Sequence, residues 1–386
     1  MRRDSKRPAG VILADSVRLP VPFIYYRYPV AMRLEHACRR LPLLTVAVLA
    51  FLGGVSPERA AAIDLILPTS NHALLEGKPE DFYMFTSEGR ETPWAGGQYG
   101  YVRNGRQTKL GEVFTRFHEG VDIKPVYRDA AGKPLDTVMA ISQGRVAYAC
   151  TTAGRSNYGR YIVVEHIWNG SPYYSLYAHL NEVWVTAGDI VEQGSSIGLL
   201  GYTGVGINRR RAHLHFEVGL LLSSYFDAWH SIISPRDSNY HGIYNGHNIS
   251  GVDVARLYLA MREDPSMTMP EFIATEKVGF RMTVPNNGPI DLLQRYPWLM
   301  PKKLRRESPP SWEISFSSSC LPLAILPSKD TVTEPTVTAL PDGEIPYTYV
   351  THGMLRGSGD KYTITRWGHD YLGLITHNGE DEKAAR

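Results

Sequence analysis

The sequence predicts a predominantly β protein with antiparallel sheets, followed by a smaller mixed α+β region at the C-terminal end. Short apolar or alternating runs follow one another from Glu112 to about Pro235, separated by Gly, Asn and Asp. Consecutive strands without an intervening helix favour antiparallel pairing. The 35 glycines, 26 prolines and 23 tyrosines fit turn-rich β structure better than helical bundles.

The region after residue 237 mixes both kinds of element. Helical spacing in DVARLYLAMRED predicts a helix capped by Ser250 or Asp253, and MPEFIATEK and PIDLLQRY are shorter helix candidates. β character returns from Ser311 to Ile375, in WEISF, YTYVTHGML and KYTITRWG. The proline-rich pieces at 301–310 and 322–335 are interpreted as linkers or long loops.

Size and charge limit the classes of protein that the chain can represent. Its 386 residues exceed one ordinary domain and suggest two, and the 43% hydrophobic fraction is enough for packed cores. The 21% charged fraction and net charge of +2 lack the strongly basic character of nucleic-acid-binding proteins. We therefore expect no nucleic-acid partner.

The N-terminal stretch has the pattern of an export signal. Arg33, Arg39 and Arg40 precede an apolar run from Leu41 to Val55, and Ala60-Ala61-Ala62 supplies a small-residue cleavage site. The run is short for a bilayer span, which favours cleavage over the alternative of an uncleaved anchor. We therefore expect an exported protein, periplasmic or associated with the cell envelope, without a stable membrane span after cleavage.

Two further features bear on export. About thirty residues precede the basic stretch, which is long for a signal, so Met32 is a more natural start than Met1. Cys38 would leave with the signal. Cys150 and Cys320 would then remain, either as a disulfide or, as we favour, as two buried thiols.

Three short motifs carry groups that bind metals. HEGVD places His118 four residues before Asp122, YAHL holds His179, and AHLHFEV holds His213 and His215 two apart in a predicted strand. Alternation along a strand points both of those last histidines to one face. Three protein ligands leave a coordination position open for water, which is typical of catalytic metal sites. Each motif alone is a weak signal, but together they predict a metal centre.

The stretch from Tyr99 to about Leu220 resembles the lysostaphin-type zinc endopeptidases, a family that cleaves peptide crosslinks of bacterial peptidoglycan. HEGVDI resembles the family's H-x-G-x-D motif, and SQGRVAYA, YGRYIVVEH, YYSLYAHL, VTAGDIVEQGSSIGLLGYTG and HLHFEV follow in the family's order. GQYGYVR resembles the segment that leads into the domain. The resemblance implies an antiparallel β-sheet groove of the duplicated hybrid motif type, with Zn²⁺ on its floor.

The resemblance also implies roles for individual residues. His118, Asp122 and His215 would hold Zn²⁺, whereas His179 and His213 would contact the reacting water or the developing oxyanion. Histidine can transfer protons near neutral pH or stabilise tetrahedral charge, and either of the two can be the general base. The expected organisation is an export region (1–62), a leading segment (63–111), a zinc endopeptidase domain (112–236) and an accessory region of unknown role (237–386).

Two departures from the family pattern surround the site. The turn before His213 is longer than usual and carries Arg209, Arg210 and Arg211, which form either a solvated loop or a basic lip for substrate carboxylates. Residues 127–134 lengthen the turn after the first ligand pair. Neither departure removes a predicted ligand.

Three functional interpretations follow. The favoured one is an exported zinc endopeptidase that hydrolyses stem peptides or crosslinks of peptidoglycan. The rival is a non-enzymatic wall-associated module that regulates other wall hydrolases, as relatives that have lost zinc ligands do, but all five histidine and aspartate positions are intact here. A surface-binding β protein with a structural metal would need a fourth protein ligand, which the motifs do not supply.

Overall fold

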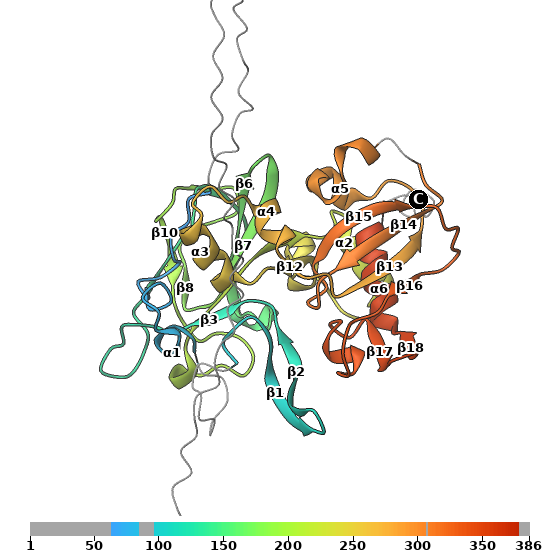
Figure 1. Ribbon diagram of the computed structural model, residues 1–386. Coiled ribbons are helices and arrows are strands. Elements are labelled where there is room, and N and C mark those ends of the chain that lie inside the picture. The colour runs from blue at the N-terminus through green and yellow to red at the C-terminus, as the bar shows by residue number, and fades with distance from the viewer. Residues whose placement is uncertain (1–62, 85–95, 306–307, 378–386) are drawn as a thin grey trace, which may run out of the picture. The chain divides into compact units, whose positions relative to one another are not determined.

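The region in which the sequence predicts β structure is built around antiparallel strands (Figure 1). The structure is a computed structural model that describes residues 63–84, 96–305 and 308–377. The predicted export region, 1–62, lies outside these residues. Within the described ranges, none of the helices has the length and apolar character needed to cross a membrane.

The largest sheet among the described residues has seven strands. Its order is β12-β11-β7-β6-β5-β9, and β3 pairs with β11 off this path. The strands are β3 (Val121–Ile123), β5 (Gly144–Cys150), β6 (Arg160–Trp168), β7 (Ser171–Leu180), β9 (Ile190–Val191), β11 (Leu214–Leu221) and β12 (Ile249–Gly251). All pairings are antiparallel, so this prediction is confirmed.

Both faces of this sheet are covered. Along β6, Ile162 and Val164 belong to the main core, while Tyr161 and Val163 belong to a second cluster. Because successive side chains of a strand point to opposite faces, this alternation places the two clusters on opposite sides of the sheet. Burial on both faces explains why the sequence shows near-continuous apolar runs here.

Smaller elements surround the large sheet. β1 (Gly100–Thr108) and β2 (Gly111–His118) form a long hairpin, coloured cyan in Figure 1. β4 (Thr137–Met139), β10 (Ser196–Leu199) and β8 (Glu182–Val183) form a three-stranded sheet, and α1 (Pro79–Phe82) precedes them in the chain. The hairpin matters for function because β2 ends at His118.

The C-terminal elements are mixed, as predicted. β13 (Phe280–Pro285), β14 (Ser311–Phe316), β15 (Pro322–Ser328) and β16 (Thr336–Ala339) form a sheet of order β15-β14-β13-β16, and β17 (Leu355–Ser358) pairs with β18 (Lys361–Ile364). The helices are α2 (Phe226–Ile233), α3 (Val254–Glu263), α4 (Met269–Ala274), α5 (Asp291–Arg295) and α6 (Arg366–Thr376). The Asp253 side chain caps α3 by accepting from the Arg256 amide, which confirms one of the two predicted caps.

Three sequence expectations in this region are wrong. The proline-rich piece 322–335 is not simply a loop, because it contains β15; this strand lies at the edge of its sheet, where proline is tolerated. The YTYVTHGML stretch contains a 3₁₀ turn, η7 (Tyr347–Tyr349), and only its end enters β17. β character does not continue to Ile375, because α6 begins at Arg366.

α6 forms because its local sequence suits a helix. The Thr365 side chain accepts from the Gly368 amide at the N-terminus of the helix. Tyr371 and Ile375, four residues apart, are both buried. In Figure 1 the helix lies beside the four-stranded sheet, and the Tyr371 hydroxyl donates to the Cys320 carbonyl at 3.0 Å. Tertiary burial therefore completes the helix.

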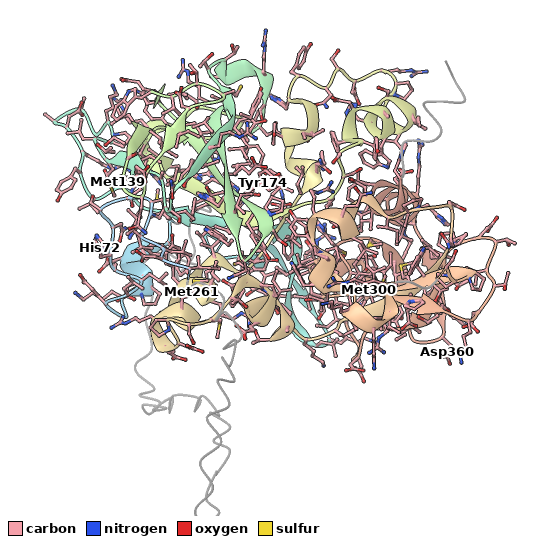
Figure 2. All side chains as sticks on the ribbon, turned by 90° about the horizontal axis from the view of Figure 1, so that it is seen from above. His72, Met139, Tyr174, Met261, Met300 and Asp360 are labelled. Atoms are coloured by element: carbon pink, nitrogen blue, oxygen red, sulfur yellow. The ribbon has the colours of Figure 1, made fainter. Side chains whose placement is uncertain are left out.

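Contacts also join the C-terminal elements to the large sheet. The Leu221 amide at the end of β11 donates to the Tyr296 hydroxyl at 2.9 Å, and Nη2 of Arg295 donates to the Leu222 carbonyl at 2.9 Å. Figure 2 shows Tyr174 on the large sheet and Met300 among the C-terminal elements. The boundary near residue 236 stays a prediction.

Candidate metal centre

Three side chains from three strands meet at one point. His118 ends β2, Asp122 lies in β3, and His215 lies in β11 directly opposite Asp122. Nε2 of His118 lies 3.0 Å from Nδ1 of His215, and both atoms lie 3.1 Å from Oδ1 of Asp122. Ligands about 2.0–2.2 Å from a tetrahedral ion lie roughly 3.3–3.6 Å apart, so only a small expansion would let these atoms bind one zinc-sized cation.

Hydrogen bonds at the opposite ring nitrogens leave these donor atoms available. Nδ1 of His118 lies 2.6 Å from the Gln98 carbonyl oxygen, and Nε2 of His215 lies 2.7 Å from Oε1 of Glu217. Because a carbonyl or carboxylate oxygen accepts, each of these nitrogens must carry the proton. In the neutral rings, His118 therefore presents the lone pair of Nε2 to the common point, and His215 presents that of Nδ1.

The two oxygens of Asp122 face different partners. The side chain is wholly buried, and Oδ2 accepts from Nη2 of Arg103 at 2.6 Å while Oδ1 faces the histidines. Burial opposes the charged form, but attraction to His118, His213 and Arg103 outweighs it and holds the pKa of Asp122 well below its usual range. The carboxylate is therefore ionised at neutral pH, as metal binding requires.

Gly120, in the middle of HEGVD, permits a close approach to β11. A Cβ atom at this position would lie 2.4 Å from the carbonyl oxygen of Phe216 and 2.7 Å from Cγ of Glu217. A side chain therefore could not fit without displacing the strand that carries His215. The glycine keeps the two ligand-bearing segments close together.

The two histidines predicted to act in catalysis face the same centre. Nδ1 of His179 lies 2.8 Å from the Thr203 carbonyl, and Nδ1 of His213 lies 2.7 Å from the Arg211 carbonyl. Each Nδ1 must donate, which leaves both Nε2 atoms as acceptors in the neutral rings. Nε2 of His213 lies 3.3 Å from Oδ1 of Asp122, and the His179 and His213 rings meet edge to face, 4.9 Å between centroids.

His179 has an unusual backbone conformation. Its φ is 63°, in the left-handed region that residues with a Cβ rarely adopt. Such conformations cost about 1–3 kcal/mol and persist where the surroundings impose them. Here the His179 amide donates to the Tyr158 carbonyl at 2.8 Å, while Thr203 holds the ring. These contacts hold the His179 ring beside His213.

Burial and charge set the protonation of the centre. Burial lowers the pKa of His118, and burial together with His213 and His215 holds the pKa of His179 well below its usual range. Burial also disfavours a charged His215, but its bonds to Asp122 and Glu217 prevail and raise its pKa to about 9. In the metal-free site His215 therefore carries an extra proton between two carboxylates, which a metal must displace.

The centre opens into a cavity of about 1140 Å³. Part of the wall comes from the segment after β11, through Asp237, Ser238, His241, Asn245, Gly246 and His247. The cavity is also lined by Arg103, Arg116, Arg155 and Arg211. Arg103 is paired with Asp122, whereas the other three have no carboxylate partner within the described part of the chain.

The predicted basic lip is divided. Residues Arg209–Arg211 form a 3₁₀ turn, η2, and Arg211 lines the cavity while Arg209 and Arg210 are not among its lining residues. Nη1 of Arg211 donates to the Gly206 carbonyl at 3.1 Å. Its buried Nε has no hydrogen-bond partner among the described residues. Of the three arginines, Arg211 is therefore the candidate for binding a substrate carboxylate.

One buried histidine and the two cysteines have structural environments. His166 is buried and stacks on Trp168. Its Nδ1 lies 2.8 Å from the Gln143 carbonyl oxygen, and its Nε2 lies 2.8 Å from Oγ of Ser175. Cys150 and Cys320 are free and buried, as favoured above. None of these three residues lines the cavity.

Sequence reasoning missed Arg103 and Glu217. The sequence does contain one signal for Glu217. This residue follows His213 and His215 at the same two-residue spacing, so its side chain points to the same face of the strand. Apart from His215, it is the one polar side chain in the strand Leu214–Leu221. Arg103 has no such signal, because its contact with Asp122 depends on how the β1–β2 hairpin folds beside β3.

The antiparallel strands and this donor set agree with the resemblance to lysostaphin-type metallopeptidases that the motifs indicate. Residues 116–224 match Peptidase family M23, so the resemblance expected from the motifs is confirmed for this region. The match covers the region of all five predicted site residues. It ends before the segment 237–247 that completes the cavity wall.

Similar proteins were found by sequence and by structure. A lipoprotein NlpD/LppB homolog of Pseudomonas aeruginosa is 36% identical over 90 residues, which are 23% of this chain and 27% of that protein. A zinc-containing peptidase of Vibrio cholerae is 25% identical with TM-score 0.22, covering 36% of each chain. The catalytic domain of lysostaphin from Staphylococcus simulans is 28% identical with TM-score 0.23, covering 32% of this chain and 76% of that one. The chain thus spans about a quarter of the curated relative.

Proposed function

We propose that the chain is an exported zinc-dependent endopeptidase that hydrolyses stem peptides or crosslinks of bacterial peptidoglycan. One observation carries the proposal. Three donor atoms, of His118, Asp122 and His215, face one point, and His179 and His213 face it from the side. The M23 match supports a metallopeptidase, and the signal-like N-terminal sequence supports export.

The donor set suits zinc. Two neutral imidazoles and one carboxylate are ligands that zinc accepts, and three protein ligands are typical of its catalytic sites. Arg103 neutralises one of the two carboxylates at the centre, Asp122 and Glu217, so the site would have a net negative charge for a divalent cation once the extra proton of His215 is displaced. When bound, zinc would act as a Lewis acid that lowers the pKa of water towards about 7 and polarises a carbonyl.

The remaining chemistry falls to the chain's own residues. Nε2 of His179 and Nε2 of His213 are acceptors, because the Thr203 and Arg211 carbonyls hold the protons on Nδ1. Either atom is placed to take a proton from the attacking water, and the other ring can then stabilise charge on the oxyanion. Backbone carbonyls hold both rings, so little reorganisation is needed when substrate arrives.

The cavity wall favours a substrate with carboxylates. Arg116, Arg155 and Arg211 line the cavity without a carboxylate partner in the described ranges. Guanidinium groups bind carboxylates by charge-assisted hydrogen bonds, and peptidoglycan stem peptides carry free carboxylates. The overall charge of +2 is small, so this preference would come from local placement of arginines.

Digestion of purified peptidoglycan tests the proposal. Full-length protein loaded with one equivalent of zinc should release muropeptides with new peptide ends, and His179→Ala protein with the same metal content should release far fewer. No new peptide ends from zinc-loaded wild-type protein would contradict the endopeptidase. If the same protein instead stimulated a second wall hydrolase, the non-enzymatic alternative would be supported.

A further inference from the structure

A buried carboxylate and a tyrosine lie next to the ligand His215. Glu217 is 0% exposed. Its Oε1 lies 2.7 Å from Nε2 of His215 and accepts from the Tyr158 hydroxyl, also at 2.7 Å. Its Oε2 has no hydrogen-bond partner within the described part of the chain. A buried carboxylate with one unsatisfied oxygen is costly, so its position beside a predicted metal ligand calls for a functional reason.

The contact determines which nitrogen of His215 is available. A neutral imidazole carries one proton, and the carboxylate at Nε2 keeps that proton there. Nδ1, which faces His118 and Asp122, then retains its lone pair. Without an acceptor beside Nε2, the proton could move to Nδ1, and the atom facing the centre would be a donor instead of a ligand.

Contacts on two sides determine where the Glu217 side chain lies. On one side, Gly120 leaves room for its Cγ, since a Cβ there would lie 2.7 Å away. On the other, Tyr158 holds Oε1, and the backbone of Gly246 packs against the tyrosine ring. A Cβ at Gly246 would lie 2.6 Å from both Oη and Cε2 of Tyr158.

Gly246 belongs to a segment outside the M23 match. It begins the 3₁₀ turn η4 (Gly246–Asn248), which precedes β12. Asn248 anchors this turn, because it is wholly buried and its Nδ2 donates at 2.8 Å to the carbonyls of both Ser223 and Ile243. The turn is therefore a fixed support for the Tyr158 ring.

We propose that Glu217 is a positioning residue that selects Nδ1 of His215 for the metal, and that Tyr158 and Gly246 hold Glu217 in place. A segment beyond the family region thereby supports the metal centre. The inference rests on the proposed metal site, and it is independent of which bond the protein cleaves.

Zinc affinity of the full-length chain tests this inference directly. Competition with a chelator should show zinc bound about 10–100-fold more weakly by Glu217→Ala, the usual effect of removing a group that orients a ligand. Glu217→Gln keeps an oxygen that can accept from Nε2, so it should restore part of the loss. Tyr158→Phe and Gly246→Ala should also weaken zinc binding, and to similar extents, because both disturb the hydrogen bond from the Tyr158 hydroxyl to Glu217.

The chain offers a matched control in the same sheet. Oε1 of Glu165 accepts from the Tyr174 hydroxyl at 3.0 Å, so Glu165 and Tyr174 form a glutamate–tyrosine pair that does not include a metal ligand. Glu165→Gln and Tyr174→Phe should therefore leave zinc affinity unchanged. A general loss of stability would affect both pairs, whereas positioning of His215 affects only the Glu217 pair.

A second measurement reports which ring nitrogen of His215 carries the proton. Nitrogen-15 spectra of histidine-labelled, zinc-loaded protein should show His215 protonated at Nε2 in the wild type and a changed nitrogen pattern in Glu217→Ala. Wild-type affinity together with an unchanged His215 pattern in that variant would overturn the inference. Should Glu217→Ala not fold, unchanged affinity in both Tyr158→Phe and Gly246→Ala would do so. Wild-type protein that binds zinc but cleaves no wall peptide would contradict only the proposed function.

Discussion

His215 and Asp122 lie directly opposite each other on β11 and β3, with Nδ1 3.1 Å from Oδ1. Backbone pairing thus aligns two groups that lie 93 positions apart in the sequence. A slip of one residue would turn one of them to the other face of the sheet. The metal centre therefore depends on strand register as much as on the identity of its ligands.

We expect one zinc ion per chain, held through His118, Asp122 and His215. Metal analysis of protein purified without chelator should find close to one equivalent, and His215→Ala should lose most of it because a buried ligand is removed. His369→Ala, an exposed histidine on α6, is the control and should keep its zinc. Full retention of metal by the His215 variant would rule out this assignment.

His179→Ala and His213→Ala should keep the metal but lose activity. In the proposed site three other groups would hold the ion, whereas these two rings would face the reacting water. Loss of a proton-transfer or oxyanion partner typically costs about 10²–10⁴ in rate. Turnover and zinc content should be measured on the same preparations, and wild-type turnover in both variants would exclude the proposed roles.

Arg211→Ser should raise KM for wall substrate by about tenfold and weaken its salt dependence, with kcat less affected. Arg211 lines the cavity, and a charge-assisted hydrogen bond to a carboxylate contributes about 1.5–3 kcal/mol. The double variant Arg209→Ser, Arg210→Ser is the matched control, because these residues do not line the cavity. Identical kinetics for both variants across a salt series would indicate a solvated loop.

His166 should make the fold sensitive to mild acid. Burial lowers its pKa to about 4, whereas in the unfolded chain it would titrate near 6.5. Between these values the unfolded state binds the extra proton, so stability falls as pH decreases, by up to about 3 kcal/mol. Urea unfolding from pH 7 to pH 4 should show a steeper loss for wild type than for His166→Gln. Parallel curves would contradict a buried neutral His166.

The exported protein should begin near Ile63. The basic stretch, the apolar run and Ala60-Ala61-Ala62 predict cleavage there. N-terminal sequencing of the protein recovered outside the cytoplasm checks this directly. An intact Met1 or Met32 start confined to the cytosolic fraction would contradict export.

Local patterns predicted much of the fold. Alternating apolar runs indicated strands of the large sheet, and Asp253, one of two candidate caps, indicated the start of α3, because alternation and capping act over a few residues. The same logic failed for β15, where proline is tolerated only because the strand lies at a sheet edge. It also failed for α6, whose apolar side chains needed a sheet to pack against.

The sequence by itself predicted the donor set of the site, because three motifs with metal-binding side chains follow one another in the order of the family that they resemble. Only the tertiary structure decided which nitrogen each histidine presents, since that depends on partners far along the chain, the Gln98 carbonyl for His118 and Glu217 for His215. It likewise placed Gly246, outside the family region, against the Tyr158 ring that donates to Glu217. Such contacts are set by how distant segments meet in space, for which no short sequence pattern provides a signal.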